Sequence, residues 1–243
     1  MNFRILILLF FAVITSIYAC KKVTYDDTVA PIDINPPHVN TINATADTIN
    51  IYQNGIRQNN LSAIYPGGAT SYLYFINGVQ NFSVKRTNTT NVLVSQTYAI
   101  HSNLYYSIFV TGTSSGNIFQ TSDAIDAAQA VIDSDATETI GVVRFVNASI
   151  NSGALNVTVG AGDTVNVHNI AYGTATAFMP FDVAHTEEVK VFVANSTLPA
   201  IDSVFTFQPS TIYTLYTRGS LTGTGNNAFA ISLAVDPYIQ PNQ

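Results

Sequence analysis

One pattern of residues occurs twice in this chain, and the duplication limits what the chain can fold into. The sequence VNTINAT at residues 39–45 returns as VRFVNAS at residues 143–149. In each copy, apolar residues stand at alternate positions before the chain reaches Asn-Ala followed by Ser or Thr. This pattern is typical of a half-buried strand that enters a tight connection.

Two further blocks recur in the same order. Residues 67–75 match residues 173–181 without a gap, and residues 106–112 match residues 213–219. Three blocks at nearly the same spacing indicate two copies of one structural unit. For a chain of 243 residues, the duplication predicts two domains of ordinary size.

Short strand candidates, bounded by turn residues, lie between these blocks. Asn54-Gly55 is the clearest turn, because both residues accept the positive φ angles of a two-residue hairpin, and Asn77-Gly78 is a second. About seven short strands per copy, separated by turns roughly every 8–12 residues, predict a β-sandwich. The candidates are residues 48–53, 82–86 and 92–100 in the first copy, and 155–159, 164–170, 189–194 and 203–207 in the second.

The end of the first copy has two interpretations. The last strand of the second copy is predicted at residues 229–235, and residues 127–132 are its predicted counterpart in the first copy. In that alignment residues 117–126 are a loop insertion. Alternatively, residues 123–132 form a short, Ala-rich helix.

Composition favours an all-β fold. Hydrophobic residues make up 47% of the chain and charged residues only 10%, against a usual charged share of roughly 25%. Solubility then depends on Asn, Thr, Ser and Gln, which suits a β surface, and many Phe and Tyr supply bulky strand formers. The net charge of −6, with no basic run beyond Lys21-Lys22, argues against a nucleic-acid partner.

The N-terminus predicts export. Arg4 is followed by an apolar run at residues 5–17, which is too short to span a bilayer and is typical of a signal-peptide core. The run ends at Ile17-Tyr18-Ala19-Cys20, and Cys20 is the only cysteine in the chain. It therefore cannot form an internal disulfide bond.

This stretch resembles the lipobox of bacterial lipoproteins, with an aliphatic residue three positions before the cysteine and a small residue directly before it. Tyr18 is bulkier than that motif usually has. The resemblance implies that Cys20 becomes the first mature residue and carries acyl chains such as palmitate, which anchor the protein in a membrane of the cell envelope, here expected to be the outer membrane. The alternative is an ordinary secretory signal in which Cys20 is incidental.

Three prolines, Pro31, Pro36 and Pro37, mark the segment after Cys20 as an extended tether. The alternative is that residues 23–34 add an edge strand to the first domain. The predicted organisation is a signal peptide at 1–19, lipidated Cys20 and tether at 20–37, a first sandwich at 38–133, a linker at 134–139, a second sandwich at 140–237 and a tail at 238–243.

At its repeated blocks the chain resembles the bacterial secreted family catalogued as domain of unknown function 4397. Units of that family open with a valine-rich strand that runs into Asn-Ala-Ser or His-Ala-Ser, and residues 143–149 match this more closely than residues 39–45. The resemblance covers residues 38–236. It implies two tandem immunoglobulin-like β-sandwiches and an envelope location, and it implies no activity.

A catalytic centre is not predicted. The stretch from Gly112 to Gly116 fits the Gly-x-Ser-x-Gly spacing of serine hydrolases, with Ser114 or Ser115 as nucleophile, but it opens no predicted helix and has no associated His and Asp. We therefore expect a loop there. No cofactor and no metal site are predicted, because no two histidines have ligand spacing and there is no calcium-binding loop. The histidines are His38, His101, His168 and His185.

Four tyrosines invite specific hypotheses. Tyr72 and Tyr105 are candidates for stacking on a sugar ring, although alternate aromatic residues in a sandwich more often belong to the core. Tyr106 and Tyr213 occupy equivalent places at the start of a late strand and resemble the tyrosine corner of immunoglobulin-type sandwiches, whose hydroxyl group bonds back to the backbone.

Four short motifs resemble the Asp-Ser/Thr-apolar acceptor of envelope O-glycosylation in Bacteroidetes-type bacteria. Such triplets also arise by chance in a Thr-rich β protein. The candidate acceptors are Thr28, Thr48, Thr164 and Ser203.

Together these features predict a lipid-anchored envelope protein that acts as a non-catalytic binding, adhesion or spacer module. Its expected partners are the membrane, through Cys20, and a glycan or protein ligand. The alternatives are a carbohydrate-binding surface lipoprotein and a secreted serine hydrolase.

Overall fold

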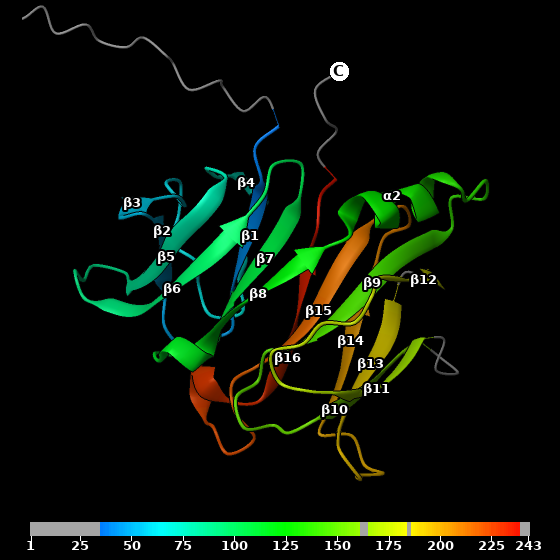
Figure 1. Cartoon of the computed structure of the whole chain (residues 1–243). Coiled ribbons are helices and arrows are strands. Elements are labelled where there is room, and N and C mark those ends of the chain that lie inside the picture. Colours follow the sequence, from blue (N-terminus) through cyan, green and yellow to red (C-terminus); the bar gives the residue numbers. More distant parts are fainter. Residues whose placement is uncertain (1–34, 161–164, 184–185, 239–243) are drawn as a thin grey trace, which may run out of the picture. The chain divides into compact units, whose positions relative to one another are not determined.

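The computed structural model describes residues 35–160, 165–183 and 186–238. These residues form two β-sandwiches, one from each copy of the repeat (Figure 1). The predicted signal peptide, Cys20, the tether up to residue 34 and its alternative as an edge strand lie outside the described residues, as do Thr28, Thr164 and His185.

The first repeat has eight described strands in two four-stranded sheets, ordered β4-β1-β7-β8 and β3-β2-β5-β6. A 3-10 turn, η1 (Ser115–Asn117), precedes its last strand, and a helix, α2 (Ile125–Asp133), follows it. The strands are β1 (His38–Asn43), β2 (Ile49–Gln53), β3 (Ile56–Arg57), β4 (Leu73–Tyr74), β5 (Gly78–Arg86), β6 (Val92–Ile100), β7 (Tyr105–Val110) and β8 (Ile118–Asp123).

The second repeat has the same topology, with sheets ordered β12-β9-β15-β16 and β11-β10-β13-β14. As β1 pairs in parallel with β7, so β9 pairs in parallel with β15. This correspondence confirms the prediction of two tandem β-sandwiches. A 3-10 turn, η2 (Gly225–Asn227), precedes the last strand. The strands are β9 (Ile140–Asn147), β10 (Leu155–Val159), β11 (Val165–Ile170), β12 (Met179–Asp182), β13 (Thr186–Val193), β14 (Ile201–Thr206), β15 (Ile212–Arg218) and β16 (Ala230–Val235).

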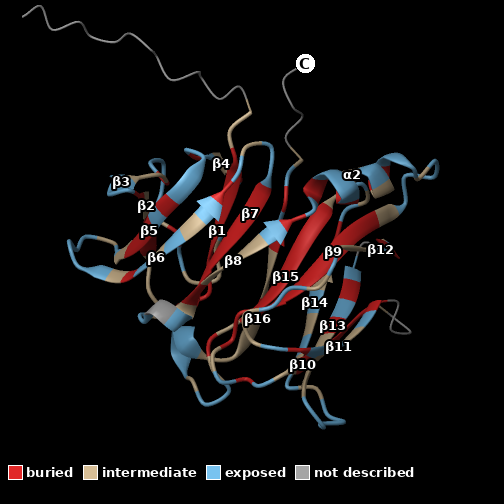
Figure 2. Cartoon of the chain, in the orientation of Figure 1, coloured by how far each residue is buried: buried red, intermediate tan, exposed pale blue. Residues whose placement is uncertain are grey.

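The sheets β4-β1-β7-β8 and β12-β9-β15-β16, called the facing sheets below, are covered on both sides. Every residue of β1 and β7 is buried, as the red central strands in Figure 2 show. Successive side chains on a strand point to opposite faces. Val39 therefore packs in the core of the first sandwich, whereas Ile42 packs in a cluster with Val146 and Tyr216 of the second repeat. Two covered faces explain the continuous burial.

One of the two predicted Asn-Gly turns forms a hairpin. Asn54 and Gly55 have φ angles of 50° and 85° and join β2 to β3, which confirms the first prediction. The prediction for Asn77-Gly78 is wrong, because β4 and β5 belong to different sheets. The chain crosses there from one layer of the sandwich to the other.

The helical interpretation of residues 123–132 is confirmed, and the prediction of a strand at residues 127–132 is wrong. In α2, Ile125, Ala128 and Ile132 recur at helical spacing and pack together in a cluster with Tyr72 and Tyr105. A strand would have put these apolar residues on opposite faces. The counterpart of β16 is β8, so the segment predicted as a loop insertion contains a strand.

Candidate functional site

Both predicted tyrosine corners are present. The Tyr106 hydroxyl accepts a hydrogen bond from the His101 backbone N at 3.2 Å. The Tyr213 hydroxyl accepts one from the Gln208 backbone N at 2.6 Å and donates to the Gln208 carbonyl at 3.3 Å. Each corner ties the start of a facing-sheet strand to the loop before it. These two tyrosines are structural.

A polar cluster lies between the repeats, where the facing sheets meet. The side chain of Arg144, in β9, is 2% exposed, and its Nη1 lies 2.5 Å from Oδ1 of Asp123 in β8. Arg144 Nη2 donates to Ser107 Oγ at 3.1 Å, and Arg144 Nε donates to Thr214 Oγ1 at 2.7 Å. A guanidinium from the second repeat thus binds side chains of both repeats.

Asp123 is surrounded by donors. Its Oδ2 accepts hydrogen bonds from the Tyr72 hydroxyl at 2.7 Å and from Ser107 Oγ at 2.6 Å, and its Oδ1 accepts one from Thr121 Oγ1 at 2.8 Å. Burial raises the pKa of Tyr72 well above its usual value, and the carboxylates of Asp236 and Asp123 raise it further. The Tyr72 hydroxyl therefore stays protonated and donates to the carboxylate.

Asp236 is the counterpart of Asp123 in the second repeat. Tyr106 pairs with Ser122 and its equivalent Tyr213 pairs with Val235, and the next residue after each partner is an aspartate. Asp236 is 1% exposed, and its Oδ2 accepts a hydrogen bond from Thr214. Burial raises the pKa of Asp236 to about 6, although Arg144, Thr214 and the side-chain amide of Asn40 act to lower it.

The duplication supplies two carboxyl groups but only one guanidinium to this cluster. The position of Arg144 in the second copy is occupied by Asn40 in the first. Both residues are buried in the facing sheets. The cluster is defined here as Asp123, Arg144 and Asp236. All three side chains are buried where the repeats meet, and Arg144 also lines a pocket of about 250 Å³ beside α2.

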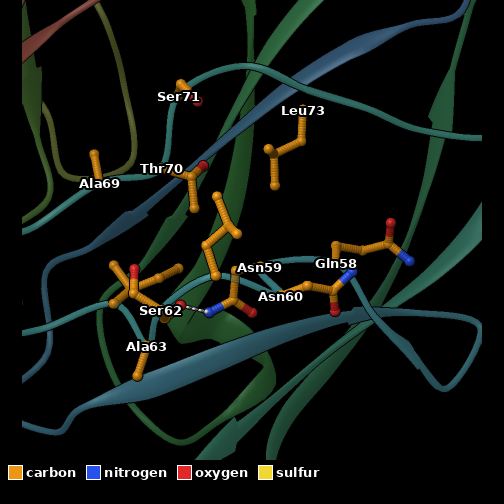
Figure 3. Close-up of a pocket in the computed structure, with 11 residues that line it drawn as sticks. Gln58, Asn59, Asn60, Ser62, Ala63, Ala69, Thr70, Ser71 and Leu73 are labelled. Atoms are coloured by element: carbon orange, nitrogen blue, oxygen red, sulfur yellow. Dashed lines mark hydrogen bonds between the residues drawn. The ribbon is translucent and has the colours of Figure 1, made fainter.

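An exposed pocket of about 390 Å³ lies in the first repeat between the end of β3 and the start of β4 (Figure 3). This edge pocket is lined by side-chain amides, hydroxyl groups and alkyl groups. Leu61 on its rim is fully exposed, and Asn59 beneath it is buried. The lining residues include Gln58, Asn59, Asn60, Leu61, Ser62 and Leu73.

The edge pocket forms because an edge strand is interrupted. In the second repeat, β11 pairs with β10 from Val165 to Ile170. In the first repeat the equivalent pairing is limited to the two residues of β3 and a bridge between Ile49 and Ile64, and residues 59–63 leave the sheet. The Asn59 side chain replaces the lost backbone partner, because its Oδ1 accepts a hydrogen bond from the Ile51 backbone N at 3.0 Å.

The ligand-stacking prediction for Tyr72 and Tyr105 is corrected by their burial. Each ring is 4% exposed, and the two rings meet edge to face at 5.1 Å between centroids. The Tyr105 ring also stacks on His38, and both tyrosines pack with α2. A sugar cannot reach a ring face that other side chains cover. Exposed rings belong instead to Tyr74, which shares the alternating pattern of Tyr72, and to Tyr65, which the sequence pattern did not single out.

The remaining candidate residues are dispersed. Ser114 is exposed in the loop before η1, which is a single 3-10 turn, and its side chain has no hydrogen bond to a histidine or carboxylate within the described segments. Thr48, directly before β2, and Ser203, within β14, are half-buried. His38 is buried, whereas His101 and His168 are exposed.

The described residues contain no group of three or more His, Cys, Asp or Glu side chains that could hold a metal ion. Within the same residues, no helix is both long and apolar enough to cross a membrane.

Comparison with known proteins gives one family. A family model described as a domain of unknown function, number 4397, matches residues 37–136 and again residues 141–243. The two matches coincide with the two sandwiches. No curated protein matches the chain.

Proposed function

Because the chain belongs to the family described as domain of unknown function 4397, whose description names no activity, we propose a function from the arrangement of its side chains. The protein is a lipid-anchored module of the cell envelope that binds a ligand without transforming it. The paired sandwiches act as a rigid body that presents the edge pocket.

One contrast carries this proposal. The charged residues that lie together in the core, Asp123, Arg144 and Asp236, are buried between the repeats. The exposed edge pocket has the opposite character, since it is lined by amides, hydroxyl groups and alkyl groups. Catalysis usually needs a nucleophile, acid or base within reach of the substrate, whereas such a neutral lining suits recognition.

The anchor is proposed from the sequence. An export signal that ends at a sole cysteine supports lipidation of Cys20 and attachment to the outer membrane, facing either the periplasm or the outside. Binding residues on a rigid scaffold, held at a membrane by a tether, suit capture of envelope or extracellular material.

Two measurements test the proposal. Cells of the native host that are fed an alkyne-tagged fatty acid should label the wild-type chain and not Cys20→Ala. The purified protein should also fail to react with a fluorophosphonate probe. Fatty-acid label that persists in Cys20→Ala would remove the proposed anchor, and fluorophosphonate labelling at Ser114 or Ser115 would replace binding with hydrolysis.

A further inference from the structure

The second repeat serves as an internal reference for the edge pocket. Ile49 and Ile64 in the first repeat pair as Leu155 and Ile170 do in the second. The whole stretch has the same length in both repeats but is divided differently. Arg57 occupies the register position of Asn166, and six residues separate Arg57 from Ile64 where three separate Asn166 from Ile170. The turn between the paired strands is shorter by three residues in the first repeat, and the three extra residues lie in the projecting loop, with loss of backbone pairing in the sheet.

The projecting loop is held in place by one buried side chain. Asn59 Nδ2 donates to the Ser62 carbonyl at 2.7 Å and to Asn50 Oδ1 at 3.0 Å, while Asn59 Oδ1 accepts from the Ile51 backbone N. Figure 3 shows the bond from Asn59 to Ser62 beneath the pocket. These bonds fix the loop before any ligand arrives, which lowers the entropic cost of binding.

The chemistry of the lining selects an uncharged, hydroxyl-rich ligand. None of the residues that line the edge pocket is acidic, basic or histidine. The Asn60 amide has no hydrogen-bond partner among the described residues, and a side-chain amide can both donate to and accept from a hydroxyl group. Leu61 and Leu73 supply apolar surface for the C–H faces of a sugar ring.

A peptide strand fits the edge pocket less well. Peptides that bind at a sheet edge add a strand by pairing with free backbone groups. Here the edge of β2 is already occupied, because Ile51 bonds to Asn59 and Gln58, and Ile49 bonds to Ile64. The ligand must therefore meet side chains rather than a free strand edge.

We propose that the edge pocket binds an uncharged saccharide, with Asn60 and Leu61 as contact residues. This inference rests on the binding function proposed above. Tyr65, directly after the pocket-lining Ile64, is 68% exposed and adds a ring face beside the loop.

The test uses the full chain in detergent and an array of oligosaccharides of glucose, mannose, galactose and N-acetylglucosamine, with polygalacturonate and an unstructured peptide as competing classes. At least one neutral sugar should bind. Asn60→Ala and Leu61→Ala should each weaken that binding about tenfold, the loss expected when a ligand hydrogen bond or a well-packed contact is removed.

Asn166→Ala is the control, because Asn166 is an exposed asparagine in β11, the regular edge strand of the second repeat. It should leave binding unchanged. All three variants alter exposed side chains, so their melting temperatures should equal that of the wild type.

Absence of binding to any neutral sugar, a preference for polygalacturonate or the peptide, or equal binding by Asn60→Ala and Asn166→Ala would overturn the saccharide proposal. Each of these results leaves the anchor and the lack of hydrolase activity intact, since fatty-acid and fluorophosphonate labelling measure those separately.

Discussion

Arg144 Nη1 lies 2.5 Å from Asp123 Oδ1, and this buried ion pair joins one copy of the repeat to the other. Removing one partner of a buried pair leaves the other charge without compensation. In this protein the remaining charges would be the carboxyl groups of Asp123 and Asp236. The pair therefore matters more for joining the repeats than an exposed pair of the same length would.

Replacement of Arg144 by Met should lower the free energy of unfolding by about 3–5 kcal/mol at pH 7, as measured by denaturant titration. The control is Arg86→Met, which removes the exposed pair with Asp47 and should cost much less, because exposed ion pairs contribute little to stability. Equal losses in the two variants would contradict a special role for the buried pair.

Stability should depend on pH through Asp236. Its pKa is raised from 3.8 to about 6 in the folded protein, so between these values the folded state binds more protons than the unfolded state. The contribution of Asp236 is then most favourable below about pH 4 and is lost as pH rises through about 6. Asp236→Asn should remove this dependence.

The measurement compares unfolding free energies of the wild type and Asp236→Asn from pH 4 to pH 7.5. The free-energy difference between the two proteins should shift in favour of the variant by about 2 kcal/mol over that range, since one pKa unit is worth about 1.4 kcal/mol. Asp202→Asn, at an exposed position in β14, is the control for the substitution itself. Parallel curves for the wild type and Asp236→Asn would rule out a titrating Asp236.

Loss of a tyrosine corner should cost about 1–2 kcal/mol, because Tyr213→Phe leaves the Gln208 backbone N without its acceptor. Thermal unfolding measures this. Tyr74→Phe is the control, because the Tyr74 side chain is largely exposed. A melting temperature for Tyr213→Phe as high as that of Tyr74→Phe would show that the corner does not stabilise the sandwich.

Local patterns in the sequence predict most of the fold. Alternating residues identify the strands, the repeated blocks identify the two sandwiches, and the matched positions of Tyr106 and Tyr213 identify the corners. The sequence of the Ala-rich segment at residues 123–132 is compatible with a strand or a helix. The segment forms a helix because Ile125 and Ile132 then pack together against the second repeat.

The sequence pattern does not reveal which strand faces meet the other repeat. Tyr72 and Tyr105 fit a solvent-facing pattern, yet the second repeat and α2 cover them. The sequence pattern does not predict the buried cluster either, because its side chains also lie on strand faces that the other repeat covers. Its one signal was the charged Arg144 within a strand, where the first copy has Asn40. No sequence pattern predicts the edge pocket, because it depends on the Asn59 side chain taking the place of a backbone hydrogen-bond partner of β2.

The central claim is that the buried cluster and the apolar contacts around it join the two sandwiches into one cooperative unit. Scanning calorimetry of the full chain at pH 5 tests it most directly. One transition, whose calorimetric and van't Hoff enthalpies agree, is the predicted result. Two separate transitions, with the lower one unmoved by Arg144→Met, would contradict it.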